Sequence, residues 1–185
     1  MNSSKTYISN HNPLSVWFIG LPCSGKTTLA KGVFQRLINS GFKVKVLDGD
    51  DLRKGINKNL GFSLEDRTEN IRRVAEVSRL FVEEGYITLN AVICPLNEMQ
   101  QIARNIIANY YVEIFVDAPI EVCEKRDLKG MYRKARLGEI KQFTGIDSPF
   151  EPPVHPDVII RTDQTNEDDC ISDIYKFLVE KVKNQ

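Results

Sequence analysis

Apolar residues recur along this chain in short runs that alternate with longer amphipathic stretches. The short runs predict β-strands, and apolar residues spaced three or four positions apart predict helices. We expect strands at residues 16–19, 42–47, 86–93, 111–116 and 158–160. We expect helices at residues 27–39, 63–84, 99–109, 120–127 and from 165 onward, with a short helix or turn at 52–59. This alternation predicts an α/β fold: a five-stranded parallel sheet sandwiched by helices.

Local residue types mark where several helices begin or end. Gly41 suits a left-handed cap after the first helix. Ser63 and Thr165 each stand three residues before an acid, which is the spacing of a capping box. Pro119 suits the first residue of a helix, because proline lacks the N–H that a first turn leaves unpaired.

A glycine-rich loop follows the first apolar run. Gly20–Thr28 matches G-x-x-x-x-G-K-[ST] between a predicted strand and a predicted helix, which is the setting of a phosphate-binding loop. The glycines let successive N–H groups point at phosphate oxygens, the lysine reaches the outer phosphates, and the first threonine holds Mg²⁺. A chance match has a probability on the order of one per cent. The loop predicts a P-loop NTPase fold with nucleotide-binding residues Gly20, Cys23, Ser24, Gly25, Lys26, Thr27 and Thr28.

Acidic residues follow the second predicted strand. Taken alone, Asp48-Gly49-Asp50-Asp51 is equally consistent with a surface turn, because Asp and Gly dominate turns. The phosphate loop changes this balance, because the carboxyl ends of parallel strands share the sheet edge at which such folds bind ligands. We therefore expect the acidic loop to lie beside the phosphate loop.

Positive charge is concentrated in one later segment. Residues 125–141 carry seven lysines and arginines against two acids, and Gly130, Gly138 and Gly145 punctuate this region. The alternatives are a basic surface helix and a mobile lid that folds over polyphosphate. The glycines and the one-sided charge favour a lid at about residues 128–150.

The composition limits the number of domains and the kinds of partner. With 185 residues, 42% of them hydrophobic, we expect a flexible N-terminal arm at residues 1–13 and a single domain at residues 14–185. Lys plus Arg and Asp plus Glu each total 25, so the overall charge favours neither nucleic acid nor a membrane as partner. Four widely spaced cysteines, the polar N-terminus and the lack of a run of ~18 apolar residues fit a soluble cytoplasmic protein.

Two observations separate the possible nucleotide-dependent activities. GTP switches read the base with an N-K-x-D element after a late strand, and Arg161-Thr162-Asp163-Gln164 does not supply it. A phosphoryl-transfer enzyme has to hold ATP, place an acceptor opposite it and exclude water. The phosphate loop, the acidic loop and the basic lid fit these three tasks, so the pattern predicts a small kinase.

The later blocks carry a more specific resemblance. From D-G-D-D-L-R and N-K-N-L-G-F to G-E-I-K-Q-F-T-G-I-D-S-P, the sequence is similar to adenylylsulfate kinases. The matching blocks are residues 48–53, 57–62, 65–67, 69–73, 115–119, 123–127, 134–136 and 138–149. The resemblance runs from about Trp17 to the last helix, in the family's order, which makes coincidence negligible.

The resemblance implies a kinase that uses ATP and Mg²⁺ to phosphorylate the ribose 3′-hydroxyl of adenosine 5′-phosphosulfate (APS) in sulfate activation. The family also makes a homodimer the expected assembly. Arg126 and Thr165 would join the phosphate loop in binding ATP. The acceptor nucleotide would be held by Asp50, Arg53, Phe62, Arg67, Asn70, Ile93, Cys94, Lys129 and Phe143.

The resemblance also implies catalytic roles. Lys26 would act on the transferring phosphoryl group, while Asp48 and Asp50 are the candidates for orienting the 3′-hydroxyl and the waters of the metal ion. Thr27 would hold Mg²⁺, with Asp48 reaching it through water. Sequence leaves open which aspartate takes the hydroxyl proton, and a loose transition state demands little of a base.

Three features depart from the family pattern. Cys23 stands where the family usually has glycine, and the loop either tolerates the thiol or becomes sensitive to oxidation. Cys94 replaces a usual serine, and residues 96–99 are apolar and acidic where the family has an aromatic residue and a basic or charged segment. Two alternatives therefore stay open: a related 3′-kinase for another activated nucleotide, such as a nucleoside diphosphoramidate used in polysaccharide decoration, and a non-catalytic nucleotide-binding regulator. The intact lysine, threonine and aspartates argue against the regulator.

Overall fold

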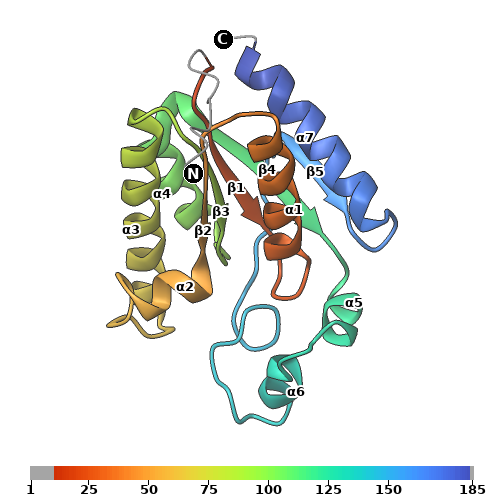
Figure 1. Ribbon diagram of the computed structural model, residues 1–185. Helices are drawn as coiled ribbons and strands as arrows, with labels where there is room; N and C mark the ends of the chain where they lie inside the picture. The colour runs from red at the N-terminus through yellow and green to blue at the C-terminus, as the bar shows by residue number, and fades with distance from the viewer. Residues whose placement is uncertain (1–10, 184–185) are drawn as a thin grey trace, which may run out of the picture.

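A computed structural model describes residues 11–183, which contain a five-stranded sheet whose neighbouring strands all pair in parallel (Figure 1). The order is β2-β3-β1-β4-β5. The strands are β1 (Ser15–Ile19), β2 (Val44–Asp48), β3 (Ile87–Ala91), β4 (Tyr111–Asp117) and β5 (Val158–Arg161). All residues of the central β1 are buried, as an apolar strand covered on both faces should be. The α/β prediction is confirmed, and each strand ends within two residues of its expected bounds.

Helices cover both faces of the sheet and bury two apolar cores. One face carries α1 (Lys26–Asn39) and α7 (Glu167–Lys183), and the other carries α3 (Leu64–Glu83) and α4 (Asn97–Ile107) (Figure 1). The shorter helices are α2 (Gly49–Lys54), α5 (Ile120–Lys125) and α6 (Met131–Arg136), and a 3₁₀ turn spans Ala108–Tyr110. In the described part of the chain, no helix has the length and apolar character needed to cross a membrane.

The three short helices lie beyond the carboxyl ends of the strands, where the loops gather (Figure 1). A third, smaller apolar cluster joins α5 and α6 to the phosphate loop and includes Cys123, Tyr132 and Phe143. Residues 1–10 of the expected N-terminal arm lie outside the described residues. The Asn12 N–H donates to the Val182 carbonyl at 3.3 Å, so the chain enters beside the end of α7.

Several helix starts differ in detail from the expected ones. The acidic segment after β2 is the start of a helix and not a surface turn. The Asp48 carboxylate accepts the Asp50 N–H at 2.9 Å and caps α2, which starts at the next residue. Pro119 is the N-cap of α5 and not its first residue. The cap of α7 is Asn166 and not Thr165, because the Asn166 side chain accepts a main-chain N–H of the first turn at 3.0 Å. The expected Ser63 cap of α3 is confirmed.

The start of α4 is completed by a residue that is distant in sequence. Leu96 occupies the N-cap and offers no side-chain acceptor. The Glu151 carboxylate instead accepts the Asn97 N–H at 2.8 Å, and the Glu151 N–H donates to the Pro95 carbonyl at 2.7 Å. Gln100 Nε2 donates to the Glu151 carbonyl at 3.2 Å. These bonds fasten the segment after residue 150 to the loop that follows β3.

Removing the Glu151 carboxylate should destabilise the protein. Glu151→Ala deprives the first turn of α4 of its acceptor, and losing an N-cap acceptor costs about 1 kcal/mol. In a chain of this size we expect Tm to fall by about 2–4 °C, measured by circular dichroism during heating. Glu180→Ala, at an exposed position of α7, is the matched control and should shift Tm by about 1 °C or less. Equal shifts for the two variants would contradict the capping role.

Candidate active site

The phosphate loop connects β1 to α1, and close packing and backbone conformation fix its shape. A Cβ on Gly20 would lie 2.4 Å from the Val116 carbonyl oxygen, so the loop approaches β4 too closely for any side chain. Gly25 precedes α1 with a φ of 109°. Cys23 has a φ of 61°, a left-handed conformation that costs an L-residue roughly 1–2 kcal/mol. The conformation explains why glycine suits this position, and Cys23 carries local strain there.

The thiol pKa is raised at both cysteines that depart from the family pattern. Burial, followed by the nearby Asp127 carboxylate, raises the pKa of the Cys23 thiol above its ordinary value. Burial raises the pKa of the Cys94 thiol well above that value, and Cys94 is fully buried in the apolar cluster beneath α3 and α4. Because the thiolate is the reactive form, these shifts favour a loop that tolerates Cys23 over one that is sensitive to oxidation.

Lys26 is folded beneath its own loop. Its ammonium donates to the Gly20 carbonyl at 2.9 Å and to the Leu21 carbonyl at 2.6 Å. The residue is only 8% exposed, and burial lowers its pKa to about 8. The described structure therefore holds a buried cation in the phosphate loop, with main-chain oxygens as its partners.

Thr27 and the acidic loop lie together. Thr27 Oγ1 donates to Asp48 Oδ2 at 3.0 Å, and Asp48 Oδ1 accepts the Asp50 N–H. Hydroxyl and carboxylate oxygens are the hard donors that Mg²⁺ prefers, so the pair fits this ion. Within residues 11–183, no group of three His, Cys, Asp or Glu side chains could hold a metal ion. A Mg²⁺ ion here would need phosphate oxygens of the nucleotide to complete its coordination.

Two arginines flank an exposed aromatic ring, and we call Arg53, Phe62 and Arg67 the Arg–Phe cluster. The Arg53 guanidinium lies 4.4 Å from the centroid of the Phe62 ring, and that of Arg67 lies 5.6 Å from it. Arg53 donates to the carbonyls of Leu60 and Gly61 at 3.1 and 3.0 Å. Phe62 is 56% exposed, whereas Arg67 is almost buried. A ring flanked by cations suits a ligand with a planar base and anionic groups.

The loop that carries the Arg–Phe cluster is held to α3 by polar contacts. Asn57 is fully buried, and its Nδ2 donates to Asn70 Oδ1 at 2.9 Å. Arg73 donates to the Ile56 carbonyl and to Asn59 Oδ1, both at 2.8 Å. Asn70, which is expected to bind the acceptor nucleotide, is therefore oriented by Asn57 of the loop that carries the Arg–Phe cluster.

The segment expected to form the lid, residues 128–150, contacts the acidic loop and the phosphate loop. The Lys129 ammonium forms an ion pair with the Asp50 carboxylate. The Tyr132 hydroxyl donates to the Pro22 carbonyl at 3.0 Å, and the Phe143 ring meets the Tyr132 ring edge-on with centroids 4.9 Å apart. The segment thus brings Lys129 and Phe143 to the other predicted site residues.

A second part of this segment reaches the Arg–Phe cluster. Arg67 Nη2 donates to the Gln142 carbonyl at 2.6 Å. Gln142 has a φ of 57°, and the Asp147 carboxylate accepts the N–H groups of Gln142 and Phe143 at 2.9 and 2.6 Å. These two main-chain bonds lower the pKa of Asp147 below its ordinary value. Asp147 therefore fixes the turn that presents the Gln142 carbonyl to Arg67.

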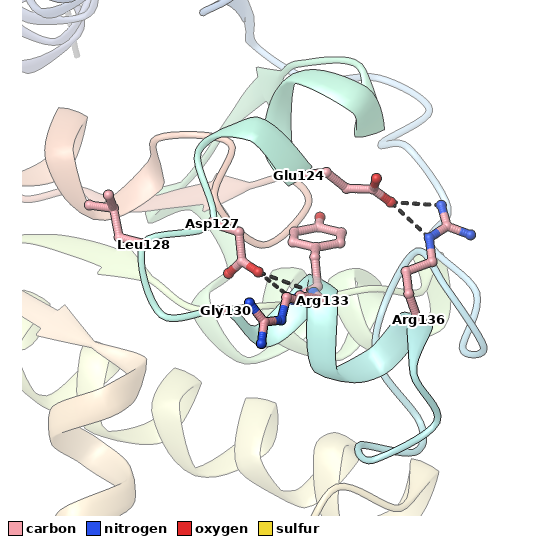
Figure 2. A pocket seen from close by; sticks show the side chains of 7 residues that line it. Glu124, Asp127, Leu128, Gly130, Arg133 and Arg136 are labelled. Carbon is pink, nitrogen blue, oxygen red and sulfur yellow. Dashed lines mark hydrogen bonds and ion pairs between the residues drawn. The ribbon is translucent and has the colours of Figure 1, made fainter.

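The base of the segment is anchored to α5 around a hollow of about 400 Å³ (Figure 2). The Asp127 carboxylate accepts the N–H groups of Met131 and Tyr132 at 2.8 and 2.7 Å, which caps the start of α6. On the other side of the hollow, Arg136 binds Glu124 Oε1 through two nitrogens at 3.0 and 2.6 Å. The charge of Arg136 is therefore balanced by Glu124 of α5.

The remaining predicted residues lie at different depths. Arg126 donates to Thr162 Oγ1 at 2.9 Å and to the Thr162 carbonyl at 2.6 Å, at the sheet edge beside the phosphate loop. Thr28 is exposed in the first turn of α1, Thr165 is exposed after β5, and Ile93 is partly buried after β3. Their contacts with a nucleotide stay predictions, as does any contact of the buried Cys94 with an acceptor.

Several known proteins are similar in sequence to this chain. A family model described as adenylylsulphate kinase matches residues 12–161, which is most of the chain. The chain belongs to the adenylylsulphate kinase family. An adenylyl-sulfate kinase of Clostridium acetobutylicum is 50% identical over 163 residues, covering 88% of this chain and 82% of that protein. A probable adenylyl-sulfate kinase of Bacillus subtilis is 46% identical over 184 residues, covering 99% and 90%.

Solved structures agree with membership of the adenylylsulphate kinase family. The Mycobacterium tuberculosis APS kinase CysC in complex with AMPPNP and APS is similar, with a TM-score of 0.87 and 42% identity over 90% of this chain and 98% of that one. A hexameric APS kinase from Thiobacillus denitrificans has a TM-score of 0.70 at 26% identity, covering 93% of this chain and 30% of that one. A gluconokinase from Sinorhizobium meliloti, at 13% identity and a TM-score of 0.64, shares the fold alone.

Several contacts in this adenylylsulphate kinase family member were not predicted from its sequence. Asn57, Arg73, Tyr132, Asp147 and Thr162 each hold a backbone group or a side chain of the site. Four of the five lie in or beside blocks that resemble the family, but all except Asp147 bind partners at least 13 residues away, so periodicity and spacing gave no signal of these bonds.

The pKa of Lys26 predicts opposite effects of pH on nucleotide affinity and on stability. Above pH 8 the free protein loses the ammonium that would face phosphate, so the affinity for Mg–AMPPNP should fall by up to about tenfold per pH unit. The folded pKa lies below the unfolded value of about 10.5, so the folded chain binds fewer protons between these values. Lys26 therefore destabilises the nucleotide-free fold below pH 8, and its effect shifts towards greater stability as pH rises from about 8 to 10.5.

Calorimetric titration and urea unfolding at pH 7 to 9.5 measure these two trends. Lys26→Met is the control. It should bind Mg–AMPPNP more weakly, and neither its affinity nor its stability should show the pH dependence that Lys26 causes. An affinity that falls equally steeply above pH 8 in Lys26→Met would show that another group titrates.

Proposed function

We propose that this protein transfers the γ-phosphoryl group of ATP to the ribose 3′-hydroxyl of APS, giving 3′-phosphoadenosine 5′-phosphosulfate and ADP. The observation that carries the proposal is a continuous link between two unlike binding surfaces. Asp48 contacts Thr27 of the phosphate loop and also caps α2, the helix that carries Arg53 of the Arg–Phe cluster. The phosphate loop, which suits polyphosphate, and the Arg–Phe cluster, which suits a base and anionic groups, are therefore linked through the acidic loop that carries Asp48 and Asp50. Similarity to the M. tuberculosis APS kinase structure, which holds AMPPNP and APS, supports this pairing.

The proposed reaction assigns different work to the charged side chains. The bond between the γ-phosphorus and the β–γ bridging oxygen breaks, a bond to the 3′-oxygen forms, and the hydroxyl proton leaves. The Lys26 ammonium has three donors and uses two of them on loop carbonyls, so the third would donate to a phosphate oxygen. Both Asp48 oxygens hold protein donors, which suits a fixed role. Asp50 is exposed, and its carboxylate is free to turn to the acceptor if Lys129 moves, so it is the better candidate to receive the proton.

Magnesium belongs to this proposal. Thr27 would hold the ion and Asp48 would reach it through water, as the oxygen donors at this position allow. A bound Mg²⁺ ion neutralises charge that develops on the transferring phosphoryl group. The chain's own contribution is to hold the threonine hydroxyl and the carboxylate side by side before the nucleotide arrives.

The acceptor site would form between the Arg–Phe cluster and the proposed lid. Asn70 would add an amide, and Lys129 and Phe143 would close over the ligand from residues 128–150. The unusual residues 96–99 form the start of α4, which Glu151 completes, whereas the Arg–Phe cluster comes from other elements.

Assembly and location complete the proposal. We expect a cytoplasmic homodimer, as in the family prediction, with residues 128–150 acting as a mobile lid. The hexamer named for the T. denitrificans APS kinase belongs to a chain of which this protein spans less than a third. Multi-angle light scattering of the purified protein, with and without ATP, measures its assembly.

Turnover with a panel of acceptors tests the function. Coupled ADP release should show kcat/KM for APS at least about tenfold above that for adenosine 5′-phosphoramidate, a cytidine diphosphoramidate or AMP, because the arginines recognise the phosphosulfate. Lys26→Ala should lower kcat on the order of 10²-fold or more, as loss of a transition-state donor does. Preference for a diphosphoramidate would support the related 3′-kinase. ATP binding without turnover of any acceptor would support the regulator.

Replacing Arg67 tests the acceptor side separately. Arg67→Ala removes a guanidinium from Phe62 and from the Gln142 carbonyl, so we expect KM for APS to rise about tenfold or more and KM for ATP to change by about twofold or less. Arg72→Ala is the matched control, because Arg72 lies on the same helix and pairs with Glu69 at the surface. Steady-state kinetics with each substrate varied in turn give both constants. Equal increases in the two KM values would place Arg67 outside the acceptor site.

A further inference from the structure

We propose that Thr162 is a positioning residue for the phosphate loop, because its hydroxyl holds the Ser24 carbonyl and thereby keeps the Gly25 N–H turned to the opposite side, toward bound polyphosphate. The proposal rests on the proposed function only in so far as the loop binds polyphosphate. It does not depend on the identity of the acceptor.

Thr162 is held in place by the sheet itself. It follows β5 directly, and its N–H donates to the Asp117 carbonyl at 3.0 Å, one step beyond the pairing of β4 with β5. Because this bond extends the parallel ladder, the backbone beneath the side chain is fixed by the sheet. The hydroxyl is therefore presented to the phosphate loop from a rigid support.

The direction of the hydroxyl proton follows from the chemistry of its two partners. Arg126 Nη1 lies 2.9 Å from Thr162 Oγ1, and a guanidinium has donors but no acceptor, so the hydroxyl oxygen accepts there. The hydroxyl has a single proton, and it is left for the Ser24 carbonyl at 2.9 Å. A second Arg126 bond, to the Thr162 carbonyl at 2.6 Å, keeps the guanidinium in place.

The bond to Ser24 controls the orientation of the following N–H. In a planar trans peptide the carbonyl and the N–H point in opposite directions, so fixing the Ser24 carbonyl also fixes the Gly25 N–H. Gly25 has a φ of 109°, and glycine passes between conformations more readily than other residues. This peptide would therefore turn easily without a tether, and the Thr162 hydroxyl supplies one.

Three other carbonyls of the loop also accept hydrogen bonds from side chains. Lys26 holds the carbonyls of Gly20 and Leu21, and the Tyr132 hydroxyl holds that of Pro22. Carbonyl oxygens repel phosphate, whereas N–H groups attract it, so a loop whose carbonyls are bound by the protein is organised to bind an anion. Thr162 extends this arrangement to the last peptide before α1.

A competing role for Thr162 can be separated by the choice of ligand. Thr162 binds Arg126, which is expected to contact ATP, so its hydroxyl could instead act on the adenosine part of the nucleotide. Inorganic tripolyphosphate has the phosphates without the base or ribose. A residue that orients the loop affects both ligands, whereas one that serves adenosine affects ATP alone.

The test compares Thr162→Val with Thr162→Ser in the full-length protein. Valine keeps the shape and removes the hydroxyl, and serine keeps the hydroxyl. Isothermal titration with Mg–tripolyphosphate and with Mg–ATP should show Thr162→Val weakened by about fivefold to thirtyfold for both ligands, the range expected for one or two lost hydrogen bonds. Thr162→Ser should stay within about threefold of the parent, well below the effect of the valine variant. Thermal unfolding confirms that both variants are folded at the titration temperature.

A double-mutant cycle tests the part assigned to Arg126. Arg126→Met should weaken tripolyphosphate binding in the parent and add little in the Thr162→Val background, because both changes remove the same orienting contact. Additive losses would overturn this step of the proposal.

Three results would overturn the proposal as a whole. In the first, Thr162→Val binds tripolyphosphate as tightly as the parent does. In the second, it loses affinity for ATP alone, which would place Thr162 at the adenosine. In the third, Thr162→Ser is as impaired as Thr162→Val. Since no acceptor is present, failure to phosphorylate APS would refute the proposed function and leave this test intact.

Discussion

The hydrogen bonding of the phosphate-loop carbonyls is the constraint on which the rest of the site depends. A loop that receives an anion through its N–H groups must turn its carbonyl oxygens elsewhere, and buried carbonyls need donors. Here the donors come from three places: Lys26 of the loop itself, Tyr132 of α6, and Thr162 after β5. The proposed lid and the edge strand are therefore part of the nucleotide site before any nucleotide is bound. The lowered pKa of Lys26 is a consequence of the same burial.

The proposed acceptor half is built on the same physical principle with other residues. Arg53 and Arg67 donate to carbonyls of the loop between α2 and α3, and Arg67 also donates to the Gln142 carbonyl. Asp147 holds the turn that carries this carbonyl. The cations thus organise the protein's own backbone in the described structure, and a ligand would have to take over some of these bonds. A ligand that binds Lys129 would likewise have to replace its ion pair with Asp50.

The fold was predictable where short-range patterns agree with the packing. The apolar run that forms β1 is fully buried, as its composition predicts. The Ser63 side chain accepts the Asp66 N–H, as the capping-box spacing predicts. Prediction was less accurate where two neighbouring residues are both of a type that caps helices. Thr165 and Asn166 are such a pair, and in the structure the Asn166 side chain accepts the Asp169 N–H. The strain at Cys23 was not visible in the sequence, because it depends on a backbone angle that the surrounding loop imposes.

By itself, the sequence determined the layered fold, the phosphate loop, the acidic loop beside it and the family. These features follow from neighbouring residues and from the rule that parallel strands end at one edge. Tertiary structure alone decided that Tyr132 and Thr162 hold carbonyls of the phosphate loop, that Arg–Phe stacking joins α2 to α3, and that Glu151 completes α4. The physical reason is the same in each case. A hydrogen bond or a ring contact between residues far apart in the chain depends on distances of a few ångströms, and only the packed structure fixes those distances.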